Sequence, residues 1–279
     1  MSAEWEEVLR KVNAFQERAT KRGSVVWYRG HRSSAWAAKS TLHRHVEDLV
    51  KLMAEAGCNI PDSGKNDLLH DEYKTLYYDF LSDAWPLLGP DERSDWGAIF
   101  SMQHHGIPTR LLDWTESFAC ALYFAQLDRP STDEAAIYAL DPQSLNLLSI
   151  DRDGLVSLSG DAAKGTIDTR LWHPKYAPPP KDPRSIAVKP PMTNKRMLAQ
   201  RAAFTVTGDS FLPLESQFAG QLGSKGYIEK ITLSPQTFPD AESFVGLAGM
   251  GHYGYFPDFE GLREKFRQKK ATVLRNIQK

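Results

Sequence analysis

The amino-acid sequence predicts an α+β fold, with a mixed sheet and flanking helices. Strand-like and helix-like segments interleave along the 279 residues, but without the regular alternation of a doubly wound parallel sheet. No internal repeat and no glycine-rich dinucleotide fingerprint is visible. A hydrophobic fraction of 41% is typical of a soluble globular chain with one sizeable core.

Four segments of the N-terminal half have clear patterns. Apolar residues recur at helical spacing from Trp5 to Val12 and again from Leu69 to Ala84, where Pro86 ends the second helix. Between them, the apolar run Val25 to Tyr28 predicts a strand. The run Phe118 to Ala125 predicts a third helix.

The C-terminal half is less regular. Residues 135–140 predict a buried strand, and the alternation of residues 227–233 predicts a half-buried one. Residues 176–191 contain six prolines, which favour an exposed loop with polyproline character. Asp258 is expected to cap a final helix.

Composition excludes several classes of protein. A net charge of −1 gives no overall attraction to nucleic acid or acidic membranes. No stretch approaches the about 18 apolar residues of a membrane helix, and the N-terminus lacks a signal-peptide core. Cys58 and Cys120 offer neither a disulfide framework nor a zinc pattern. We therefore expect a cytoplasmic protein without a membrane segment.

The run from Ser101 to Ala125 is the strongest sign of a functional site. It combines a Gly-Ile-Pro turn and an apolar helix with apolar neighbours and many polar or ionisable residues, among them His104, His105, Arg110, Asp113, Thr115 and Glu116. Unpaired polar groups are unfavourable in a core, and large apolar side chains are unfavourable in a solvated loop. Such mixed segments are typical of site-building loops held on rigid elements.

Two motifs carry a resemblance to a known family. Tyr28-Arg29-Gly30 ends the first predicted strand, and Gln103-His104-His105-Gly106-Ile107-Pro108-Thr109-Arg110-Leu111-Leu112-Asp113-Trp114-Thr115 follows about seventy residues later. The pair resembles the FRG domain family, named for its Phe/Tyr-Arg-Gly motif. The likeness continues at Trp36, Leu42-His43-Arg44, Glu72 with Phe80, Arg196 to Phe204, and Gly254 to Phe259. One departure is Ala202-Ala203-Phe204, because the family pattern implies a glycine shortly before this phenylalanine.

The resemblance also divides the chain into three parts. It implies an N-terminal helix at 1–20, an FRG domain at 21–266 and a basic C-terminal tail at 267–279.

Arg29 is the central candidate for ligand binding. A guanidinium binds two oxygens of a phosphate or carboxylate at once, and Gly30 permits close approach of a ligand. Tyr28 adjoins both residues in the motif and is assigned to the same binding site. The alternative is a structural salt bridge from Arg29 to Asp113 or Glu72.

The second motif supplies further candidates, each with an alternative role. His104 or His105 could act as a general acid or base, or fix the loop; adjacent histidines usually point in different directions. Asp113 could be a base or a ribose-hydroxyl acceptor, or cap the helix that begins near Thr115. The other polar groups are candidates for binding a polar ligand, namely Gln103, Arg110, Thr115, Arg196 and Gln200. We expect no metal, because no spacing matches a known metal pattern.

The order of these motifs is also similar to that of ADP-ribosyltransferase-like folds, which bind NAD without a glycine-rich fingerprint. This similarity implies that Arg29 holds the diphosphate or the adenylate ribose of NAD, which is the substrate. Thr115 or Ser117 would support the nicotinamide, and Gln200 or Glu229 would take the late polar position. Catalysis of ADP-ribose transfer or hydrolysis, assigned to Arg29, His104, Asp113 and Gln200, would stabilise an oxocarbenium-like sugar as nicotinamide leaves.

The alternative function is a non-catalytic module that binds a nucleotide or a nucleic acid. Residues 263–279 hold seven Lys and Arg residues against a single Glu, enough to contact phosphates. A solvated helix face on a frayed terminus explains the same residues. The sequence leaves open whether the protein is an enzyme.

Overall fold

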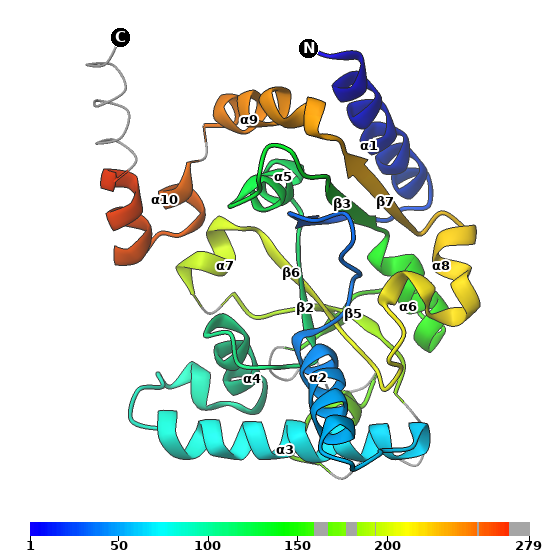
Figure 1. Ribbon diagram of the computed structural model, residues 1–279, viewed down its shortest axis with the longest axis vertical. Coiled ribbons are helices and arrows are strands. Elements are labelled where there is room, and N and C mark those ends of the chain that lie inside the picture. Colours follow the sequence, from blue (N-terminus) through cyan, green and yellow to red (C-terminus); the bar gives the residue numbers. More distant parts are fainter. Residues whose placement is uncertain (159–166, 177–182, 193, 250, 268–279) are drawn as a thin grey trace.

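Seven strands form one mixed sheet in the computed structural model, which describes residues 1–158, 167–176, 183–192, 194–249 and 251–267 (Figure 1). The strand order is β4-β5-β6-β2-β1-β3-β7. β4 and β5 are parallel, and the other described pairs are antiparallel. The strands are β1 Trp27–His31, β2 Leu111–Thr115, β3 Ala135–Leu140, β4 Val156–Ser157, β5 Ile186–Lys189, β6 Ala202–Val206 and β7 Ile228–Leu233.

Helices cover the sheet, which confirms the α+β class. Residues 259–267 are also helical. The labelled helices are α1 Ala3–Lys21, α2 Thr41–Glu55, α3 Lys65–Ala84, α4 Asp95–His104, α5 Phe118–Gln126, α6 Pro142–Ile150, α7 Lys195–Ala199, α8 Gln221–Ser224, α9 Phe238–Leu247 and α10 His252–Tyr255.

Three apolar clusters make up the core. The first joins α2, α3 and α4 to β5 and β6. The second packs α1, α5 and α9 against β1, β3 and β7, and the third places α6 and α8 near the opposite side of the same strands (Figure 1). All six residues of β3 are buried, because helices cover both of its faces.

Strong periodicity predicted the elements well. In α1, Trp5, Val8 and Val12 are buried as the spacing implied, and the Ser2 side chain caps the helix. α3 ends at Ala84, and α5, β3 and β7 lie where expected. The Asp258 carboxylate accepts a hydrogen bond from the Gly261 amide (2.7 Å), which confirms the predicted cap.

Three expectations need correction. β1 begins at Trp27 and not at Val25, which is exposed. The proline-rich stretch contains β5, an interior strand with Ile186 to Val188 buried, because its prolines flank the strand; Pro178, Pro179 and Pro180 lie outside the described residues. Residues 111–115, interpreted as part of a polar loop, form β2 in the middle of the sheet.

Candidate functional site

The sheet separates between its neighbouring strands β1 and β2. They are in register only at Tyr28 and Thr115. Each is paired along all five residues with its other neighbour, β1 with β3 and β2 with β6. Beyond the single shared pair, side chains rather than backbone ladder bonds fill the space between the two strands.

A pocket of about 380 Å³ opens at this separation. Its walls come from β1, β2 and β6, from α4, α5 and α7, and from the turn after β1, elements that converge in the middle of Figure 1. Most of the predicted site residues line it: Tyr28, Arg29, Gly30, Gln103, His104, Asp113, Thr115, Arg196 and Gln200. Arg110 does not, nor do the alternatives His105, Ser117 and Glu229. The fold thus brings residues of both motifs to one place.

Arg29 bridges the separated strands. Its Nη1 donates to the backbone carbonyl of Asp113 (2.7 Å), and its Nε donates to His31 Nε2 (2.9 Å). The Asp113 carboxylate is 3.8 Å from Nη1, too far for a hydrogen bond but within ion-pair distance, as the salt-bridge alternative for Asp113 predicted; Glu72 pairs with His45 instead. Nη2 has no hydrogen-bond partner among the described residues, so one edge of the guanidinium is available to a ligand.

His31 fixes the direction of that guanidinium. Burial, reinforced by the charge of Arg29, lowers the pKa of His31 to about 3. The neutral ring accepts at Nε2, so its proton is on Nδ1, 3.3 Å from the Trp36 carbonyl oxygen. This chain of contacts holds Arg29 in place before any ligand arrives.

Asp113 is held by Gln103. The Gln103 amide donates to Asp113 Oδ2 (2.7 Å), and its carbonyl oxygen accepts from the Thr109 hydroxyl (2.5 Å). The Asp113 side chain remains 56% exposed. The capping alternative for Asp113 was wrong, because Ser117 caps α5.

Arg196 is the second cation of the pocket. It lies on α7 with its guanidinium over the Phe256 ring, 4.6 Å from the centroid. Burial lowers the pKa of Arg196, although Asp113 and Asp258 act in the opposite direction. Its guanidinium forms no hydrogen bond or ion pair with the residues that the structure describes, which leaves its donors free for an anion.

Only one of the adjacent histidines lines the pocket. His104 does so, whereas His105 is exposed outside it. Burial lowers the pKa of His104, with contributions from the charges of Arg196 and His105. A neutral imidazole at neutral pH is able to accept a proton.

Several predicted residues have structural contacts. The Thr115 hydroxyl donates to the Gln200 carbonyl (2.6 Å), and the Gln200 amide donates to the Tyr255 carbonyl (3.0 Å). Glu229 pairs with Arg18 (2.6 Å) outside the pocket. A Cβ at Gly30 would overlap the Ala121 carbonyl oxygen. The packing of α5 therefore requires this glycine, and the expected close approach of a ligand to Gly30, which also lines the pocket, stays a prediction.

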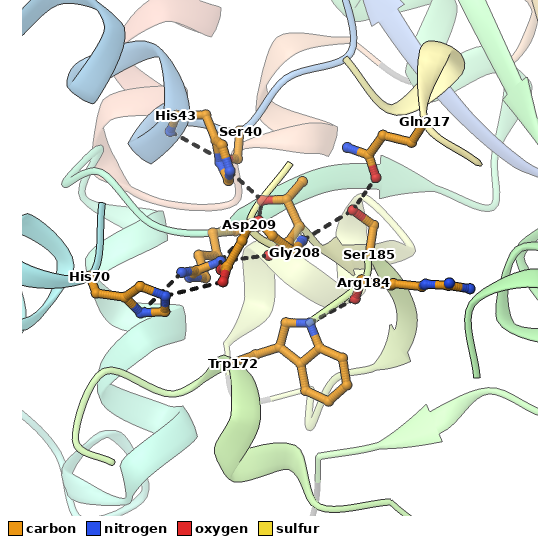
Figure 2. Close-up of polar contacts among 11 residues, drawn as sticks. Ser40, His43, His70, Trp172, Arg184, Ser185, Gly208, Asp209 and Gln217 are labelled. Atoms are coloured by element: carbon orange, nitrogen blue, oxygen red, sulfur yellow. Dashed lines mark hydrogen bonds and ion pairs between the residues drawn. The ribbon is translucent and has the colours of Figure 1, made fainter. Parts of the chain in front are cut away.

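Arg110 does not belong to this pocket, which corrects its assignment. Its side chain is 1% exposed, pairs with Asp209 (2.8 Å) and donates to the Gly208 carbonyl (2.9 Å). Asp209 also contacts His70 (3.1 Å), in the buried polar cluster of Figure 2. The guanidinium has enough partners within the protein without a ligand.

The sequence did not identify every residue of the pocket. Trp36, Phe124, Asp128 and Asn194 line it too, beside Arg32, which the sequence suggested as a further donor next to Arg29. Asn194 gave a local signal, since it is a good cap residue and caps α7. Asp128 has a positive φ of 54° at the end of α5, which no sequence pattern indicates.

The described part of the chain holds neither a candidate metal cluster nor a candidate membrane-spanning helix. No cluster of three or more His, Cys, Asp or Glu residues is arranged to hold a metal ion there. None of its helices combines the length and the apolar character needed to cross a membrane.

Fold and pocket together define an α+β domain with an anion-suited pocket where its sheet separates. The chain matches the family model of the FRG domain over residues 24–134, so it carries an FRG domain, as the two motifs implied. The match includes Arg29, Gln103 and Asp113 and ends before Arg196. No curated protein and no solved structure matched the chain.

Proposed function

We propose that the pocket binds NAD or a related nucleotide and that the protein transfers or hydrolyses its ADP-ribose. The observation that carries this proposal is the convergence of Arg29 and Arg196 on a cavity that also holds the carboxylate of Asp113. Two guanidinium groups with free donors suit a diphosphate. A volume of about 380 Å³ is within the range of small-molecule sites.

The chemistry assigned to Asp113 is electrostatic. When the bond between ribose and nicotinamide breaks, nicotinamide leaves with the bonding electrons and positive charge develops on the sugar. A carboxylate held by Gln103 (2.7 Å) stabilises that charge without reorganising. Water or an acceptor group then adds to the sugar and releases a proton, for which His104 is a candidate base in the pocket lining.

A specific observation favours the second candidate, a non-catalytic nucleotide-binding module. Both late polar residues are engaged elsewhere, Gln200 with Tyr255 and Glu229 with Arg18. Neither residue proposed for the late polar position therefore has a side chain without a partner among the described residues. Binding of a nucleic acid through the tail stays a prediction, because residues 268–279 lie outside them.

Calorimetric titration of NAD, ADP-ribose and a plain oligonucleotide tests the proposal. Arg29→Lys should weaken nucleotide binding nearly as much as Arg29→Ala, because lysine keeps the charge but loses the fork. Arg10→Lys, at an exposed pair on α1, is the control. No binding of NAD or ADP-ribose to the parent protein would refute the proposal.

Release of nicotinamide separates the two candidates. Turnover of NAD by the parent that is lost in Asp113→Asn, with binding retained, supports an enzyme. Binding without release of nicotinamide supports the recognition module.

A further inference from the structure

Trp36 differs from the other aromatic residues of the pocket. It is 46% exposed, whereas Tyr28, Phe100 and Phe204 are buried. Phe124 is half-buried and packs against Tyr123, Tyr255 and Phe256. Among the tyrosine, tryptophan and phenylalanine residues that line the described pocket, Trp36 alone is exposed.

The backbone that carries this ring is fixed. The Trp36 carbonyl oxygen accepts from the Tyr138 hydroxyl (3.1 Å) and faces His31 Nδ1 (3.3 Å). Its amide donates to the Ser33 carbonyl (3.2 Å), and the Ser34 amide donates to Glu134 (2.8 Å). The indole is therefore held at the pocket without losing its exposure.

Arg32 covers one part of this ring. Its guanidinium carbon is 5.1 Å from the indole centroid, a cation–π distance. Arg32 forms no ion pair with any described residue and also lines the pocket. His31 contacts the indole nearly edge-on, at 67°, so surface of the ring remains for a second planar group.

We propose that Trp36 is the stacking platform for the aromatic base of the bound nucleotide, with Arg32 placing positive charge beside the phosphates. This inference rests on the proposed nucleotide binding. It assigns a residue to the base, the part of the ligand by which the pocket would select one nucleotide over another. Bases stack on aromatic side chains whatever their hydrogen-bonding edges. The base is adenine or nicotinamide, and the test below distinguishes the two.

Trp85 provides a matched control within the same chain. It is 49% exposed and carries Arg93 at 5.0 Å from its ring, but it does not line the pocket. The two sites thus share an exposed indole with a stacked arginine. Only Trp36 lines the pocket. An effect that comes merely from removing an exposed indole beside an arginine should therefore appear in both Trp36→Ala and Trp85→Ala.

Titration of three probes into Trp36→Ala, Trp36→Phe and Trp85→Ala tests the inference. ADP-ribose carries only adenine, nicotinamide mononucleotide only nicotinamide, and pyrophosphate no base. Trp36→Ala should weaken one of the two base-containing probes by about ten- to a hundredfold and leave pyrophosphate unchanged. Trp36→Phe should retain most of the affinity, and Trp85→Ala should match the parent.

The outcomes separate this inference from the proposed function. The probe that loses affinity identifies the base. If the parent binds ADP-ribose and Trp36→Ala binds each of the three probes as tightly as the parent does, stacking is refuted while nucleotide binding stands. If the parent binds none of the probes, both proposals fail. Melting temperatures of all variants should agree with the parent, because both indoles are exposed.

Discussion

Arg29 and Arg110 show how similar residues acquire different roles. Each lies at or beside a strand of the sheet, and both were assigned to ligand binding from their motifs. Arg110 is 1% exposed and paired with Asp209, whereas the Arg29 side chain is 19% exposed with a free edge. The ion pair with Asp209 makes the difference, and Asp209 is remote in sequence from Arg110. No local sequence pattern therefore distinguishes the two arginines.

Replacing Arg110 should therefore affect stability rather than binding. Arg110→Met leaves the buried Asp209 carboxylate without its main cation, which should cost about 3–5 kcal/mol of unfolding free energy. Urea unfolding measures this loss. ADP-ribose affinity should be unchanged after correction for the folded fraction.

The double variant Arg110→Met/Asp209→Leu is the control, because removing both charges should recover part of the stability. A loss of affinity in a stable Arg110→Met protein would return Arg110 to the binding site.

At the scale of elements, α10 and the residues after it support one wall of the pocket. Tyr123 and His252 are hydrogen-bonded (2.6 Å), and Gln200 holds the Tyr255 carbonyl. A Cβ at Gly261 would overlap the Phe256 carbonyl oxygen, so the turn into the last helix is tight. Phe256 is thereby held under the Arg196 guanidinium.

Phe256 should act as a positioning residue for Arg196. Phe256→Leu removes the ring but keeps apolar bulk, and ADP-ribose binding should weaken by about 0.5–2 kcal/mol. Phe256→Tyr keeps the ring and should bind normally. Phe259→Leu, at a 91% exposed neighbour, is the control. Equal affinity of the Leu and Tyr variants would show that Arg196 does not need the ring.

The elements also show which parts of the fold could be predicted. α1, α3, α5, β3 and β7 have regular apolar patterns, because each buries one or both faces. β2 was missed since Asp113 and Thr115 interrupt its apolar residues. β5 was missed because it is only four residues long and lies in a proline-rich stretch. Its strand conformation depends on pairing with β6, which is remote from the local sequence.

The candidate site likewise contains residues that the sequence predicted and residues that it did not. The residues from β1 and from 103–115 were found because they are concentrated in two motifs. Trp36 and Asp128 were not assigned to the site, because the exposure of one and the backbone turn of the other arise only in the folded chain.

At the scale of the whole molecule, the sheet consists of two parts joined at one residue pair. β1 with β3 and β7 has its core against α1, α5 and α9, and β2 with β6 and β5 adjoins the core of α2, α3 and α4. Buried histidines lie in both parts, His31 on β1 and His43 on α2. Protonation of either histidine should therefore destabilise the whole fold.

The protein should lose stability in mild acid. Burial is the main cause that lowers the pKa values of both His31 and His43 from 6.5 to about 3. Below pH 6.5 the unfolded chain takes up protons at these histidines and the folded chain does not, so stability is complete above pH 6.5 and falls toward pH 3. Each histidine contributes up to roughly 1.4 kcal/mol per pH unit, or about 3 kcal/mol for the pair between pH 6.5 and 5, because each is only half protonated in the unfolded chain at pH 6.5.

Urea unfolding at pH 7.5, 6.5 and 5.0 measures this slope. His43→Asn should make it shallower, whatever its effect on stability at pH 7.5, because one proton-linked group is removed. His104 and His173, whose pKa values are also lowered by burial, contribute to the same slope. Carboxylates such as Asp209, whose pKa is held below its usual value of 3.8, lose their contribution only in stronger acid and do not affect this range. A flat profile between pH 7.5 and 5.0 would mean that the folded protein accommodates both charged imidazoles.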